Sequence, residues 1–138
     1  MRERKTLTFL LMDPPYESAR TTTAFRVLQV AAQRGYDIKV FAYEGAVALS
    51  FAQQTAHANA VHGRDAETEH HPLPKDWIAA LMRDATANGG RIDWVNCGLC
   101  VDERGVGAAI EGVRRGSPAD FWKLATDSDN TLVIPTRG

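Results

Sequence analysis

The chain has two cysteines, Cys97 and Cys100, which stand three residues apart in segment 97–105, a stretch that reads CGLCVDERG. A cysteine thiolate can attack an electrophile, bind a metal or carry sulfur, whereas a thiol buried as a small hydrophobe does none of these. Two cysteines at this spacing occur in redox couples and as half of a zinc site. Chemistry in this protein is therefore expected first at this segment.

Residues beside the pair could shift the acidity of the thiols in either direction. A free cysteine has a pKa of about 8.5, which falls near a cation or a helix N-terminus. A helical turn starting near Cys100 would point N–H groups toward Cys97, and Arg104 lies within two turns. The acidic residues 102 and 103 oppose this effect where they face the thiols, so the net sign stays open. Gly105 can end the helix.

Composition and charge narrow the class of protein. The 138 residues fit one domain, 1–138, with 44% apolar and 24% charged residues. The 16 basic and 17 acidic residues leave a net charge of −1, which gives no electrostatic footprint for nucleic acid or an anionic membrane. The apolar run 7–12 is too short for a secretory signal or a membrane span. We expect a cytoplasmic protein whose thiols are kept reduced, so reactive or metal-binding cysteines are favoured over a structural disulfide.

Strands and helices are expected to alternate along the chain. The apolar run 7–12 and residues 38–43, 92–96 and 131–134 have the composition of buried strands. Helices are predicted between them, the first capped by Thr21, Thr22 or Thr23 and ended by Gly35, and others over 45–54, 74–85 and from Pro118. This alternation predicts an α/β domain with a mostly parallel sheet, which binds ligands at the carboxyl ends of its strands. Loops 13–20 and 97–105 lie there.

A resemblance becomes specific at these two loops. Segment 97–106, CGLCVDERGV, resembles the C-x-x-C-x-D-x-R-G motif of the YchN-like branch of the DsrE/DsrF sulfur-relay family, with Asp102, Arg104 and Gly105 in the matching places. Residues 13–18, DPPYES, followed by 22–25, are similar to the small-Pro-x-Tyr loop and helix of the family. Segments 45–47 and 112–116, the latter interpreted as a turn, also fit, so the similarity covers nearly the whole chain.

The resemblance implies a fold and an assembly. It implies a flavodoxin-like three-layer sandwich with a five-stranded sheet, and trimers that pair into hexamers. In relay members with one cysteine, such as TusD and DsrE, that residue stands eight positions before the glycine matching Gly105, as Cys97 does here. The carrier role therefore falls on Cys97, and Cys100 could resolve a persulfide by forming a disulfide and releasing sulfide. Tyr16 and residues 21–23 would shape the pocket around the sulfur.

Other residues that could do chemistry have ordinary structural interpretations. His57, His62, His70 and His71 are irregularly spaced in a long polar segment, interpreted as a flap or an oligomer contact, and are expected to be solvated rather than metal ligands. Arg114 and Arg115 are interpreted as solvated charge rather than an anion site. Trp77, Trp94 and Trp122 are assigned to the core or a subunit interface.

The leading hypothesis is a carrier resembling a sulfurtransferase, with slow or absent turnover, no cofactor and no metal. It accepts sulfane sulfur on an accessible Cys97 and passes it from a donor to an acceptor protein, and it forms a homo-oligomer. One alternative is a non-catalytic oligomeric or ligand-binding module with inert cysteines. Another is a redox sensor that forms a disulfide between Cys97 and Cys100.

Overall fold

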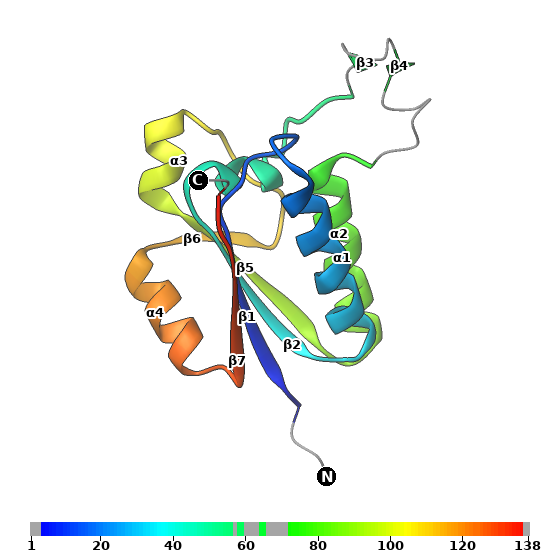
Figure 1. Ribbon diagram of the computed structural model, residues 1–138, viewed down its shortest axis with the longest axis vertical. Coiled ribbons are helices and arrows are strands. Elements are labelled where there is room, and N and C mark those ends of the chain that lie inside the picture. Colours follow the sequence, from blue (N-terminus) through cyan, green and yellow to red (C-terminus); the bar gives the residue numbers. More distant parts are fainter. Residues whose placement is uncertain (1–3, 57, 60–63, 66–71, 137–138) are drawn as a thin grey trace.

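The structure, a computed structural model, describes residues 4–56, 58–59, 64–65 and 72–136. Five helices and a five-stranded sheet form three layers, with α1 and α2 over one face of the sheet and α3 and α4 over the other (Figure 1). In chain order the elements are β1 Thr6–Leu11, α1 Ala19–Gln33, β2 Asp37–Ala42, the 3₁₀ helix η1 Glu44–Ser50, β3 Ala58–Asn59, β4 Arg64–Asp65, α2 Pro74–Ala87, β5 Arg91–Cys97, α3 Gly98–Arg104, β6 Val113–Gly116, α4 Pro118–Thr126 and β7 Asn130–Ile134.

The sheet confirms the predicted fold class. Its order is β6-β5-β2-β1-β7 and all four pairings are parallel. Numbered along the chain the strands run 4-3-2-1-5, whereas flavodoxin itself has the order 2-1-3-4-5. A separate pair, β3 with β4, is antiparallel. The four predicted strands are present, each within one residue of its predicted start.

Two clusters of buried side chains hold the layers together. The larger lies between the sheet and the pair α1 and α2, and it includes Trp94, which is fully buried, with Trp77 packed against it. The smaller lies on the other face and contains both cysteines together with Phe41, Val47, Val95, Val101 and Leu124. Alternate side chains of β2 and β5 point into opposite clusters, which is why these strands are apolar on both faces.

Local signals explain most helix ends. Pro74 and Pro118 occupy the first turns of their helices, and Asp120 accepts a hydrogen bond from the Ser117 N–H at 2.7 Å, as in a capping box. Gly35, just past α1, has a φ of +74°. The predicted threonine cap of α1 is wrong. Ser18 caps the helix instead, because its hydroxyl accepts from the Arg20 N–H at 3.2 Å.

The residue pattern does not predict the fifth strand, β6, because segment 112–116 is interpreted from it as a turn. Only Val113 in it is a large apolar residue, so the segment lacks the alternation that marks a strand. The four histidines, at 57, 62, 70 and 71, lie outside the described residues. In the described part of the chain no helix has the length and apolar character needed to cross a bilayer.

Candidate functional site

Cys97 and Cys100 come together where β5 turns into α3. Cys97 is the last residue of β5 and stands opposite Gly116 of β6, while Cys100 lies in the first turn of α3. Both are free cysteines, and both belong to the smaller buried cluster. The junction is at the carboxyl edge of a parallel sheet, which is the predicted place for a functional site.

The expectation of an accessible sulfur at Cys97 is wrong for the single chain. Cys97 is 1% exposed and Cys100 is 4% exposed. The cause is the packing of α3 over the sheet, where Phe41, Val95 and Leu124 enclose the cysteine side chains. Any reaction of these thiols with a partner therefore requires that this part of the molecule opens.

The Cys100 thiol accepts one hydrogen bond from the backbone. Its Sγ accepts from the N–H of Glu44 at 3.2 Å, and Cys97 belongs to the same buried cluster. Burial raises the pKa of Cys100 to about 11, with the hydrogen bond to Cys97 as the second cause. The Glu44 N–H acts in the opposite direction and is outweighed. Cys100 is therefore a protonated thiol at neutral pH.

Glu44 makes a second contact with α3 through its side chain. Its carboxylate forms a hydrogen-bonded ion pair with Arg104, the last residue of the helix. The backbone of Glu44 is left-handed, with a φ of +54°, which is uncommon for a residue other than glycine. Arg104, expected as a cation acting on the thiols, is thus bound by Glu44. Gly105, with a φ of +64°, ends the helix as predicted.

Arg104 was the cation predicted to act on the thiols. Arg115 of β6 is a second cation that contacts the cysteine segment. Its Nη2 donates to the Gly98 carbonyl oxygen at 3.0 Å and to Asp102 Oδ2 at 2.9 Å. Its pKa is raised, chiefly by the hydrogen bond to Asp102 and least by the charge of Cys97. Arg114 makes two hydrogen bonds to Asp93, both at 3.1 Å. The Arg114 and Arg115 side chains are 49% and 57% exposed, so they are solvated charge as interpreted, and each also pairs with a carboxylate.

Two tyrosines flank the carboxyl edge of the sheet. Tyr43, directly after β2, packs against the cysteine cluster, and its pKa is raised first by the charge of Glu44 and then by that of Cys100. Tyr16 lies in the loop after β1 with its side chain 65% exposed and a φ of +67°. Its predicted role beside the sulfur stays a prediction, whereas the packing of Tyr43 is observed.

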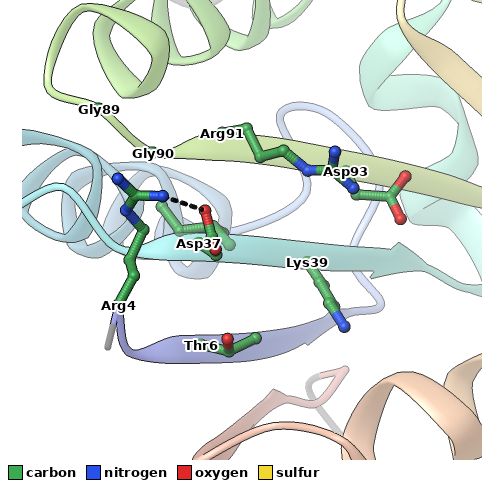
Figure 2. Close-up of a pocket in the computed structure, with 9 residues that line it drawn as sticks. Arg4, Thr6, Asp37, Lys39, Gly89, Gly90, Arg91 and Asp93 are labelled. Atoms are coloured by element: carbon green, nitrogen blue, oxygen red, sulfur yellow. Dashed lines mark ion pairs between the residues drawn. The ribbon is translucent and has the colours of Figure 1, made fainter. Parts of the chain in front are cut away.

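Surface depressions lie at both ends of the sheet. One of about 510 Å³, at the carboxyl ends, is lined by Met12, Pro14, Glu44, Gly45, Arg104 and Thr136. Another, of about 540 Å³, lies at the amino ends, where Arg4, Thr6, Asp37 and Arg91 surround it and Arg4 pairs with Asp37 at 3.9 Å (Figure 2). Ligands of such sheets bind at the carboxyl ends, where the first depression lies. A third depression, of about 420 Å³, lies beside the cysteine loop and includes Val101, Asp102 and Arg115 in its lining.

Metal binding finds no support in the part of the chain that is described. There, no three His, Cys, Asp or Glu side chains are grouped so as to hold a metal ion. The cysteine pair supplies only two sulfur ligands, and a structural zinc site needs four ligands.

Comparison with known proteins identifies the family. The DsrE/DsrF-like family matches residues 5–134. The chain belongs to the DsrE/DsrF-like family. No curated protein matched it. Among solved structures, the ychN protein of E. coli is 17% identical with a TM-score of 0.70, over 94% of this chain and 98% of that one. A conserved protein of unknown function from Bacteroides thetaiotaomicron is 13% identical with a TM-score of 0.56, over 94% of each chain.

At these identities the two structures establish the fold only. They agree with the DsrE/DsrF-like assignment and with the YchN-like sandwich expected from the two loop motifs. The family is linked to sulfur relay, and in this chain the cysteine pair lies at the carboxyl edge of the sheet.

Sequence reasoning missed three residues around the DsrE/DsrF-like cysteine pair. Glu44 and Tyr43 follow β2, which neighbours β5 in the sheet, so their position after an adjacent strand was an available signal. The third residue, Arg115, lies on β6, the strand that was not recognised. Its contact with Asp102 could not be predicted without that strand.

Proposed function

We propose that this protein is a sulfur carrier in which Cys97 accepts sulfane sulfur as a persulfide and passes it to the thiol of a partner. The observation that carries the proposal is the contact between Cys97 and a second cysteine that keeps its proton. Membership of a family linked to sulfur relay supports it. The carrier would act in the cytoplasm between donor and acceptor proteins, as a homo-oligomeric trimer or hexamer, without cofactor.

Two displacement steps account for loading and delivery. In loading, the Cys97 thiolate attacks the outer sulfur of a donor persulfide, R–S–SH, so that a Cys97–S–SH persulfide forms and the donor leaves as R–S⁻. In delivery, an acceptor thiolate attacks the outer sulfur of Cys97–S–SH and Cys97 leaves as the thiolate. Both steps conserve charge and need no oxidant, because the sulfane sulfur keeps its oxidation state.

Cys100 decides how long the persulfide lasts. Attack of the Cys100 thiolate on Cys97 Sγ would form a disulfide and expel hydrosulfide, HS⁻. Because the thiolate is the nucleophile, the raised pKa of Cys100 keeps this thiol largely protonated near pH 7. Cys100 is therefore a slow resolving thiol at neutral pH, and Cys97 holds its sulfur.

Mass spectrometry of the intact protein tests the proposal. After incubation with a persulfide or thiosulfate donor, we expect an adduct of about 32 Da, the mass of one sulfur atom, that dithiothreitol removes. Cys97→Ser should abolish the adduct, whereas the matched variant Cys100→Ser should keep it. A wild-type protein that never gains the adduct, or an adduct that survives in Cys97→Ser, would refute the proposal.

A second candidate function is a dithiol redox sensor, which the hydrogen bond between the two buried cysteines favours. Mild oxidation would then form the disulfide between Cys97 and Cys100, with a loss of two protons in mass and no sulfur adduct. The burial of both residues is also the state expected of a non-catalytic ligand-binding module. Cysteines of the native protein that resist both oxidation and alkylation would favour that module.

A further inference from the structure

Glu44 covers the buried cysteine pair by touching α3 at two points. Its backbone N–H reaches Cys100 Sγ at 3.2 Å, and its carboxylate binds Arg104, one helical turn further along. The Arg104 and Glu44 side chains are 35% and 39% exposed, while Cys100 beneath them is 4% exposed. The ion pair is thus the outer layer over the sulfur.

Contacts near both ends of η1 restrict the backbone that carries Glu44. At the next residue, Gly45, a Cβ atom would lie 2.9 Å from Pro14 Cδ, so the loop packs too closely there for any larger side chain. At the far end of η1, Ser50 Oγ accepts a hydrogen bond from Asn96 Nδ2 at 2.9 Å, and both residues are buried. Glu44 is therefore held in its left-handed conformation by fixed neighbours.

The same residue also forms the wall of the depression at the carboxyl edge. Glu44 and Arg104 line this depression of about 510 Å³ together with Met12 and Pro14. Through its backbone N–H, Glu44 also binds the Cys100 sulfur. Glu44 is therefore shared by the lining of the depression and the contact with the cysteine pair.

We propose that Glu44 is a positioning residue whose ion pair with Arg104 closes the entrance to the cysteine pair, and that incoming thiols or persulfides reach the sulfurs through this depression. The inference deepens the proposed function and rests on it, since access matters only if sulfur has to reach the pair. Its test uses alkylation alone, so that the two can fail separately.

Residue-resolved alkylation is the measurement. Native protein is treated with N-ethylmaleimide, and the modified cysteines are quantified by peptide mass spectrometry. Glu44→Gln keeps the size and the backbone N–H of Glu44 but removes its charge, and we expect it to raise the alkylation rate of the pair roughly fivefold. Glu103→Gln is the matched control, because Glu103 lies 3.9 Å from the same arginine, is 69% exposed and should leave the rate within about twofold.

A double-mutant cycle and a salt titration distinguish the loss of the ion pair from a folding defect. Arg104→Gln should raise the rate as Glu44→Gln does, and the double variant should add nothing further, because both remove one interaction. Sodium chloride should accelerate alkylation of the wild type but not of Glu44→Gln, because salt screens the ion pair. Circular dichroism confirms that each variant is folded before its rate is compared.

The pH dependence of alkylation distinguishes a positioning role of Glu44 from a general loosening of the fold. Three titratable groups interact electrostatically with Cys100, namely Cys97 after β5, Glu44 on η1 and Tyr43 after β2. Glu44→Gln removes a negative charge that raises the pKa of Cys100, so the pH for half-maximal alkylation of Cys100 should fall, while in Glu103→Gln it should stay.

The outcomes discriminate clearly. Unchanged rates in Glu44→Gln and Arg104→Gln, or an equal effect of Glu103→Gln, overturn the entrance proposal even if the wild type takes up sulfur. Faster alkylation in both variants supports it, and if no sulfur adduct forms in that case, only the proposed carrier function fails.

Discussion

At the scale of single residues, Cys97 and Cys100 have the same type and nearly the same burial but different partners. Cys100 is bound by the Glu44 N–H and has a raised pKa, while Cys97 ends a strand beside Gly98, whose carbonyl Arg115 holds. The proposed division of roles between carrier and slow resolving thiol rests on these environments, because the two residues are of the same type.

The raised pKa of Cys100 predicts a loss of stability in alkaline solution. The unfolded thiol ionises near pH 9 and the folded one near pH 11, so the folded state binds more protons between these values. The free energy of unfolding should therefore be unaffected by this group below about pH 9 and fall above it, by up to about 1.4 kcal/mol per pH unit.

Urea unfolding of the wild type and Cys100→Ala at several pH values measures this effect. The difference in free energy between the two proteins should shrink from about pH 9 upward, because Cys100→Ala lacks the titrating group. A difference that is constant over this range would contradict the raised pKa.

At the scale of elements, close packing joins β6 to its neighbours. A Cβ atom on Gly116 would lie 2.7 Å from both Val95 Cγ1 and Asp120 Oδ2. We expect Gly116→Ala to lower the free energy of unfolding by about 1–3 kcal/mol. Gly98→Ala is the control, because its Cβ would first meet the flexible end of Arg115 at 3.0 Å, and it should cost less than about 1 kcal/mol. Equal losses in urea unfolding would show that β6 is not packed as described.

The elements also show what sequence reasoning could reach. Strands β1, β2, β5 and β7 were predicted because buried strands concentrate apolar and β-branched residues, and the cysteine pair was predicted because its spacing stands out. The N-cap of α1 was misplaced because several residues there can cap. Ser18 makes a further contact within the same loop, where its hydroxyl donates to Asp13 Oδ2 at 2.6 Å. The contact of Glu44 with Cys100 spans 56 residues and has no local signal.

At the scale of the whole molecule, the protein has two separate clusters of buried side chains, one on each face of the sheet. The larger core joins α1 and α2 to the sheet, and the smaller one, on the opposite face beneath α3 and α4 (Figure 1), holds the cysteines, while η1 contributes to both. A smaller core buries less apolar surface, so we expect its elements to open at a lower free energy than the rest of the domain. The cysteines should then become exposed without global unfolding.

This division predicts how thiol labelling responds to denaturant. Alkylation of Cys97 in native protein should depend on urea with a slope far below that of global unfolding, because local opening exposes little surface. Hydrogen exchange should show the amides of α3 less protected than those of β1 and α1. A labelling slope equal to the global one would mean that the pair reacts only from the unfolded chain.

Exposed apolar side chains on the smaller-core face predict self-association. Trp122 of α4 is 72% exposed and Leu99 of α3 is 68% exposed, and both helices cover the same face of the sheet. If copies assemble over them, native mass spectrometry should show a trimer or hexamer, and Trp122→Lys should lower the mass. A monomeric wild type would contradict the predicted homo-oligomer.

The burial of both cysteine sulfurs affects how long a sulfane sulfur would stay bound in the proposed carrier. Free low-molecular-weight thiols in the cell strip sulfane sulfur from any persulfide that they can collide with. In the proposed carrier, a sulfur bound to Cys97 at the end of β5 would be shielded from such collisions, because Cys97 is 1% exposed. The burial of the site would then favour retention of the bound sulfur over rapid turnover.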